Sequence, residues 1–215
     1  RPPASTQKLL TALLIVEAGN LDKPVRVAAS DTLVEPVKLG VKPGEVYTRR
    51  ELLRVLLVHS VNDVACVLAR DNAGSVEAFA GKMNAKAREL GMIRSNFVNP
   101  NGLPAPGQYS SARDMARLAL AAYRSPTIRE IVSTKSLVFE YADGRTRAFE
   151  NTNKILRQSP FCTGMKTGYT QAAGHCLVSS GTRNGREVIA IVLGDKERSW
   201  LWRDSSSLLA WGLSL

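Results

Sequence analysis

The amino-acid sequence predicts an α+β fold in which helices cover a small antiparallel sheet and an all-helical lobe is inserted between the segments that build the sheet. Helical patterns dominate the middle of the chain. The last third changes to the alternating period of strands, around the turn dipeptides Asp143-Gly144 and Asn184-Gly185. No repeat or linker divides the 215 residues. We therefore expect one domain, with residues 1–24 and about 133–215 forming the sheet-bearing lobe and about 25–132 the mainly helical lobe.

The first predicted element is a buried helix over residues 5–18, which is apolar on nearly every face after its first turn and is followed by Gly19 as a cap. A short strand is expected over Val25–Ser30. Thr48 with Glu51 forms a capping box for a helix that continues to about His59. Further helices are expected over 62–71, over 75–90 with Ser75 as cap and Gly91 as terminator, and over 111–123 with Ser111 as cap; residues 96–109 are rich in Asn, Pro and Gly and predict a loop.

The last third predicts strands. Residues 136–141 and 145–150 flank the first turn dipeptide, and residues 175–182 and 186–194 flank the second, so each pair predicts a hairpin. A strand over 165–170 precedes the second hairpin, and a helix over about 199–211 ends the chain. These segments supply the sheet and one of its covering helices.

Charge limits the partners without selecting one. The chain has 29 Lys and Arg against 19 Asp and Glu, which gives a formal net charge of +10 and favours polyanions. The basic residues are scattered among acids without aromatic platforms, so we do not expect a nucleic-acid partner. No apolar run approaches the roughly 20 residues of a membrane span, and the N-terminus lacks the layout of a secretory signal. We expect any targeting segment to be absent or already removed.

The cysteines and histidines predict no metal site. Cys66, Cys162 and Cys176 form no C-x-x-C pair, and the two histidines, His59 and His175, do not complete a zinc pattern. We expect the thiols to behave as small buried apolar groups, with a Cys162–Cys176 bridge as an open alternative. The histidines could suggest a Ser-His-Asp triad, but His59 ends an apolar helix and His175 begins a strand, and a structural role is the better interpretation.

Three short motifs carry the chemistry: Ser5-Thr6-Gln7-Lys8, Ser60-Val61-Asn62 and Lys166-Thr167-Gly168. Each alone has an ordinary explanation, as a helix cap, a loop hydroxyl or a solvated strand end. Their conjunction, each in the setting that its chemistry needs, is harder to obtain by chance. The sequence therefore favours an enzyme with a nucleophilic serine.

The spacing of Ser5 and Lys8 explains how the serine could be activated. Residues i and i+3 of a helix share one face, with Cβ atoms about 5–6 Å apart, and the first turn lies at the positive end of the helix dipole. A lysine amine acts as a base only if its pKa falls. Burial in an apolar helix and a second cation, Lys166, both lower that pKa.

The three motifs, in this order, resemble those of low-molecular-weight penicillin-binding proteins, the serine-type D-alanyl-D-alanine carboxypeptidases. The resemblance covers nearly the whole chain and extends to the segments PPASTQKLLTALL, HSVNDVACVLA, YSSARDMARLA, NTNKIL and MKTGYTQAAGHCLVSSG. It implies a β-lactamase/transpeptidase-like fold and removal of the terminal D-alanine from peptidoglycan stem pentapeptides, without a cofactor. It also implies covalent inhibition by β-lactam antibiotics and an extracytoplasmic location.

The resemblance assigns the acylation step to four residues. Ser5 would be the nucleophile and Lys8 the base that accepts its proton. Ser60 would relay a proton to the leaving D-alanine nitrogen. The backbone N–H groups of Ser5 and Tyr169 would form the oxyanion hole.

Substrate binding is assigned to a second set of residues. Asn62 would hold the substrate amide, Lys166 and Thr167 would bind the terminal carboxylate, and Gly168 would let the substrate lie against the strand edge. The family commonly adds an arginine near the last strand. Leu201 stands where that arginine is expected, so we assign the role to Arg198 in preference to Arg203.

The chain departs from the family pattern in two respects, and three alternative functions remain open. Family members usually have about two strands and a helix before S-x-x-K, so we expect the sheet of this chain to lack its N-terminal strands and any membrane anchor to lie outside the chain. A β-lactamase would need a glutamate to activate water, but the loop Asn96–Tyr109 has none, and Ser60-Val61-Asn62 lacks the aspartate of S-D-N. A DD-endopeptidase would use the same nucleophile. The remaining alternative is a non-enzymatic basic module that binds a polymer.

Overall fold

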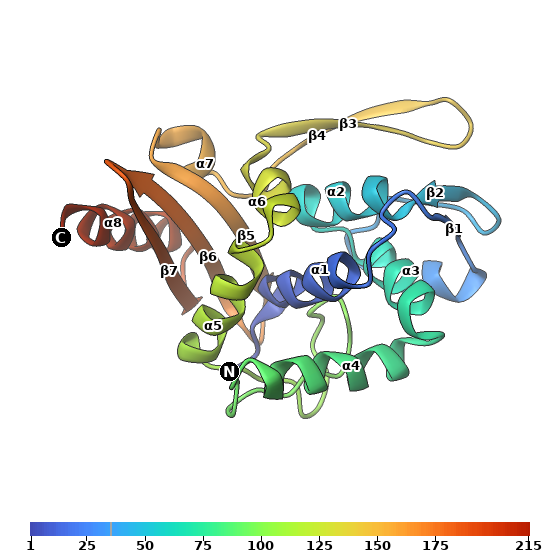
Figure 1. Ribbon diagram of the computed structural model, residues 1–215, viewed down its shortest axis with the longest axis horizontal. Coiled ribbons are helices and arrows are strands. Elements are labelled where there is room, and N and C mark those ends of the chain that lie inside the picture. Colours follow the sequence, from blue (N-terminus) through green and yellow to red (C-terminus); the bar gives the residue numbers. More distant parts are fainter. Residues whose placement is uncertain (35) are drawn as a thin grey trace.

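The computed structural model describes residues 1–34 and 36–215. Its central sheet contains three antiparallel strands in the order β5-β6-β7, and β6 is paired along its length with both neighbours. Helix α8 packs on one face of this sheet, and helices α5 and α6 lie on the other side (Figure 1). These elements span Cys162–Thr170 (β5), Gly174–Arg183 (β6), Arg186–Asp195 (β7), Ala112–Tyr123 (α5), Pro126–Ser133 (α6) and Arg198–Ser214 (α8). The predicted α+β architecture is confirmed.

The first predicted helix is present, but its first turn is tighter than expected. Residues Ala4–Gln7 form a 3₁₀ helix, η1, and the α-helix α1 follows over Lys8–Glu17. Side chains at i and i+3 nearly eclipse each other in a 3₁₀ turn, whereas they are offset in an α-helix. The tighter turn therefore places Ser5 and Lys8 in closer register than the predicted α-helix would.

The helical lobe surrounds α1, which runs through the centre of the molecule (Figure 1). Its other long helices are α2 (Arg49–His59), α3 (Asn62–Ala73) and α4 (Val76–Glu89). The Thr48/Glu51 capping box and the Ser75 and Ser111 caps are present as predicted. The strand expected over 25–30 is shorter: β1 covers Pro24–Arg26 and pairs with β2 (Val46–Thr48), and a 3₁₀ helix, η2 (Ala29–Thr32), follows. This helix forms because the Asp31 carboxylate accepts the N–H of Ala28 and turns the chain.

The first predicted hairpin, β3 (Ser136–Glu140) and β4 (Thr146–Glu150), extends over α2 (Figure 1). Helix α6 and the short helix α7 (Ile155–Gln158) were not predicted. Helix α6 begins at a Ser125 cap with Pro126 in its first turn, a pattern that sequence reasoning could have used. The three cysteines are buried and free, so the alternative of a Cys162–Cys176 bridge is wrong for this structure.

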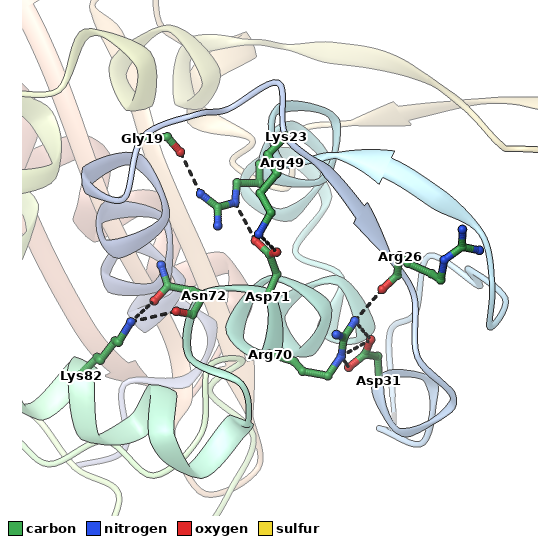
Figure 2. A network of polar contacts seen from close by, with 9 residues as sticks. All are labelled: Gly19, Lys23, Arg26, Asp31, Arg49, Arg70, Asp71, Asn72 and Lys82. Carbon is green, nitrogen blue, oxygen red and sulfur yellow. Dashed lines mark hydrogen bonds and ion pairs between the residues drawn. The ribbon is translucent and has the colours of Figure 1, made fainter.

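Ion pairs to two buried carboxylates, Asp71 and Asp31, fix α3, which begins at Asn62, against its neighbours. The Asp71 carboxylate lies 2.6 Å from Arg49 Nε and 2.7 Å from Lys23 Nζ, and Arg49 also donates to the carbonyl of Gly19 at the end of α1. One residue earlier, Arg70 pairs with Asp31 at 2.8 Å (Figure 2). The network joins the ends of α1, α2 and α3, so it fixes the relative positions of the helices that carry Lys8 and Asn62. In the part of the chain that the structure describes, no helix is long and apolar enough to cross a membrane.

Candidate active site

A cleft of about 830 Å³ follows the free edge of β5, from the helical lobe to the first turn of α8. It brings together residues from segments that are far apart in the sequence. Its lining residues are Ser5, Pro36, Val37, His59, Ser60, Asn62, Leu103, Pro104, Thr152, Thr167, Gly168, Tyr169, Thr170, Gln171, His175, Arg198, Leu201 and Trp202. Every predicted site residue therefore lines this cleft except the two lysines, Lys8 and Lys166, which are completely buried.

Ser5 and Lys8 form the closest polar pair of the site. The Lys8 amine lies 2.8 Å from Ser5 Oγ. It also lies 2.7 Å from Asn62 Oδ1 and 2.7 Å from the backbone carbonyl oxygen of Asn101. Ser5 Oγ is half-buried at the cleft wall, 3.3 Å from the same Asn101 carbonyl, so its one proton has two acceptors to choose between, this oxygen and the closer Lys8 nitrogen.

The environment of Lys8 favours the uncharged amine. Burial holds the pKa of Lys8 well below its usual range, and the charge of nearby Lys166 lowers it further. A neutral amine has two N–H groups and one lone pair. Asn62 Oδ1 and the Asn101 carbonyl can only accept hydrogen bonds, so they take both N–H groups. The lone pair is then left facing the Ser5 hydroxyl.

Ser60 and Asn62 lie where α2 ends and α3 begins. Ser60 ends α2 in a left-handed conformation, with φ of 71°, which turns the chain so that α3 starts beside the cleft. Asn62 is 3% exposed. Besides binding Lys8, its side chain donates to the carbonyl of Pro36. Asn62 is therefore held from both sides, and one of its two side-chain N–H groups remains for another acceptor.

The Lys166-Thr167-Gly168 segment forms the wall of the cleft on β5. Burial lowers the pKa of Lys166 to about 7, and its amine donates to the Thr167 carbonyl at 3.1 Å. Thr167 Oγ1 donates to Thr152 Oγ1 at 2.6 Å. Gly168 packs directly on η1. A Cβ atom at Gly168 would lie 2.7 Å from the backbone nitrogen of Ser5, so only glycine fits between the strand and the nucleophile turn.

The outer part of the cleft is aromatic and basic. Tyr169 is 60% exposed and stacks on His175 with ring centroids 4.3 Å apart. On α8, Arg198 and Leu201 both line the cleft, and the Arg198 guanidinium lies 5.9 Å from the centroid of the Trp202 ring. Thr167 and Arg198 thus line one cavity and the buried Lys166 lies on the strand that forms its wall, a combination suited to a carboxylate.

The site also contains groups that sequence reasoning missed. Both histidines line the cleft, and the His59 ring packs against Phe149 at a tilt of 47°, with centroids 4.5 Å apart. The Asn101 carbonyl contacts Lys8 directly, although a backbone contact has no side-chain signature in the sequence. Within residues 1–34 and 36–215, no three side chains of the His, Cys, Asp and Glu types gather as metal ligands do.

Comparison with known proteins gives consistent matches. The family model described as D-alanyl-D-alanine carboxypeptidase matches residues 1–197. A D-alanyl-D-alanine carboxypeptidase of Mycobacterium tuberculosis is 36% identical over 219 residues, which cover 100% of this chain and 75% of the relative. A D-alanyl-D-alanine endopeptidase of Escherichia coli is 34% identical over 215 residues, 98% of this chain and 69% of the relative.

Solved structures agree with these matches. The crystal structure of a Streptomyces DD-transpeptidase has a TM-score of 0.93 and 29% identity, and the match covers 100% of this chain and 88% of that one. The curated relatives are longer than this chain, which spans between 53% and 80% of the length of those compared.

Proposed function

Since the chain belongs to the D-alanyl-D-alanine carboxypeptidase family, we propose that it removes the terminal D-alanine of peptidoglycan stem peptides through an acyl-enzyme on Ser5. One observation carries the proposal: the Lys8 amine lies 2.8 Å from Ser5 Oγ, and its two other partners only accept hydrogen bonds. This arrangement presents a lone pair to the serine proton, which is what a general base requires.

In the proposed acylation, Ser5 Oγ attacks the carbonyl carbon between the two terminal D-alanines while its proton passes to Lys8. Ser60 relays that proton to the D-alanine nitrogen, the C–N bond breaks, and free D-alanine leaves. Water then hydrolyses the ester on Ser5 and releases the shortened peptide. In acylation the Ser5 proton leaves on the D-alanine nitrogen; in hydrolysis the water hydroxyl joins the acyl carbon and a water proton returns to Ser5 Oγ. Both steps balance without a change of oxidation state.

The developing oxyanion is assigned to the backbone N–H groups of Ser5 and Tyr169. Ser5 lies in the first turn of η1, where N–H groups have no partner within the helix. Tyr169 follows Gly168 on the free edge of β5. Removing one such donor typically raises the activation barrier by about 3–4 kcal/mol.

The carboxylate of the terminal D-alanine is assigned to Lys166, Thr167 and Arg198, and the peptide itself to the edge of β5. An extended peptide adds to such an edge by main-chain hydrogen bonds. The free N–H of Asn62 would then hold the amide on the acyl side. The approach of the substrate carboxylate raises the pKa of Lys166 from about 7, because an anion stabilises the ammonium form.

Related activities use the same nucleophile. Relatives named endopeptidases match nearly all of this chain, so hydrolysis of cross-linked peptides is the second candidate. Release of D-alanine from a pentapeptide can be compared with cleavage of a peptide dimer by the same protein. A β-lactamase would destroy penicillin catalytically, whereas we expect penicillin to label this protein stoichiometrically and leave it slowly.

The family acts on cell-wall peptides, and we assign this chain the same substrate class and an extracytoplasmic location. The direct test is Ser5→Ala, with Ser207→Ala on the exposed face of α8 as the control. Ser5→Ala should abolish both D-alanine release and labelling by a fluorescent penicillin while circular dichroism stays unchanged. Continued labelling of Ser5→Ala would reject the assignment of the nucleophile.

A further inference from the structure

The loop Asn96–Tyr109 approaches the nucleophile more closely than its sequence suggests. Gly102 in this loop has φ of +88°, and a Cβ atom there would lie 2.2 Å from the carbonyl oxygen of Ala4 and 2.8 Å from the nitrogen of Ser5. Side-chain carbons do not approach backbone atoms this closely. The loop therefore touches the Ala4–Ser5 peptide group with its bare backbone.

A second glycine contacts the same turn from β5. A Cβ atom at Gly168 would lie 2.7 Å from the nitrogen of Ser5 and 2.9 Å from that of Thr6. Ala4 is completely buried and has a positive φ of 49°, which is uncommon for a residue with a side chain. The nucleophile turn, the 3₁₀ turn η1 that carries Ser5, thus begins between two backbone segments, one at Gly102 and one at Gly168.

The loop is tied to the helix that it contacts, so the contact is held in place. Asn99 Oδ1 accepts the N–H of Gly102 at 2.8 Å, and Asn99 Nδ2 donates to the carbonyl of Leu103 at 2.9 Å. From η1, Gln7 Nε2 donates to the Asn99 carbonyl at 2.5 Å. From α1, Thr11 Oγ1 donates to the Pro100 carbonyl at 2.7 Å.

We propose that Gly102 is a positioning residue for the reaction: with Gly168 it confines the Ala4–Ser5 peptide group, and so sets the place of the Ser5 hydroxyl and of its oxyanion N–H. The inference rests on the proposed function. It goes beyond it by assigning a role in acylation to a loop residue that contributes no functional group. A displaced turn would impair two contributions to catalysis at once: the proton transfer from Ser5 to Lys8 and the hydrogen bond from the Ser5 N–H to the oxyanion.

Gly102→Ala tests the proposal, and Gly107→Ala in the same loop is its matched control. Gly107 also has a positive φ, +79°, but the nearest atom to its added Cβ is 3.8 Å away. Both variants therefore carry backbone strain, and only Gly102→Ala pushes on the nucleophile turn. A misplacement of about 1 Å costs about 100-fold in rate. The measurement is the rate constant of acylation by benzylpenicillin, separated from the dissociation constant of the initial complex by stopped flow.

We expect Gly102→Ala to lower the acylation rate constant about 100-fold, while the dissociation constant of the initial complex changes by less than about threefold. Gly107→Ala should acylate at close to the wild-type rate even where its melting temperature falls. Equal acylation rate constants in the two variants would overturn the proposal while the proposed function stands. A wild-type protein that penicillin does not acylate would overturn both.

A second pair keeps the test decisive if Gly102→Ala does not fold. Asn99→Ala removes the side-chain hydrogen bonds to the N–H of Gly102 and to the Leu103 carbonyl and adds no atoms. Asn96→Ala removes a side-chain bond elsewhere in the same loop, from Asn96 Nδ2 to the Gly107 carbonyl at 2.8 Å. We expect Asn99→Ala to slow acylation about tenfold and Asn96→Ala to leave it within about twofold of wild type. Equal acylation rates in this pair would overturn the proposal.

Discussion

Replacing Asn62 by aspartate places a negative charge beside the proposed base and tests whether that base must be uncharged. Asn62 Oδ1 lies 2.7 Å from the Lys8 amine. Two unit charges at this separation, in a medium of effective dielectric constant about 20, attract by about 6 kcal/mol, which corresponds to about four pKa units. The attraction favours the ammonium form, so it raises the pKa of Lys8 and removes the base at neutral pH.

The assay is the rate of Ser5 acylation by a fluorescent penicillin as a function of pH, with Asn62→Ala as the control. Both variants lose the donation to the Pro36 carbonyl, and Asn62→Ala also loses the acceptor for Lys8, but it adds no charge, so it should slow acylation by a similar factor at every pH. Asn62→Asp should be slowest at neutral pH and recover as the pH rises and Lys8 loses its proton. Parallel pH profiles for the two variants would refute the claim that Lys8 acts as a neutral base.

Further predictions concern stability and binding. Asp71→Ala should lower the free energy of unfolding by about 3 kcal/mol, because it leaves a buried arginine without its partner. Asp22→Ala removes one partner of an exposed, solvent-screened pair and should leave that free energy nearly unchanged; urea unfolding that gives equal losses would contradict this. Burial lowers the pKa of Lys166 from 10.5 to about 7, so the unfolded chain binds more protons above that pH. For this proton, stability should then rise by about 1.4 kcal/mol per pH unit between the folded pKa of about 7 and the unfolded pKa of 10.5. Lys166→Met should lose that contribution to the slope of stability against pH, and an unchanged slope would refute it. Arg198→Ala should lower kcat/KM for D-alanine release about tenfold. Arg203 pairs with Asp204, so Arg203→Ala should leave kcat/KM unchanged. A larger loss in Arg203→Ala than in Arg198→Ala would move the carboxylate role to Arg203.

The sequence predicted the long elements well because each combines a periodic apolar face with a local end signal. The Thr48/Glu51 box begins α2 as expected, and the two turn dipeptides begin the return strands of both hairpins. Short elements were less predictable. The strand expected over 25–30 ends at Arg26, because the Ala28 N–H donates to the Asp31 carboxylate and turns the chain into a 3₁₀ helix. Propensity alone does not reveal that bond.

The site was predictable wherever side chains do the chemistry. Ser5, Ser60 and Asn62 lie in one cleft, beside the buried Lys8 and Lys166, as the three motifs indicate. The contribution of the loop Asn96–Tyr109 was not predictable, since it consists of a carbonyl oxygen and a missing Cβ atom. Such contacts depend on how two distant segments pack, and only the density of Asn, Pro and Gly in the loop pointed to an unusual backbone.

The protonation state of Lys8 tests the central claim most directly. The nitrogen chemical shift of its amine can be measured by NMR at neutral pH in protein with ¹⁵N-labelled lysine, and Lys8→Arg assigns the signal. We predict the shift of a neutral amine, one that moves to the ammonium value only well below the pH at which exposed lysines titrate. An ammonium signal for Lys8 at neutral pH would contradict the account.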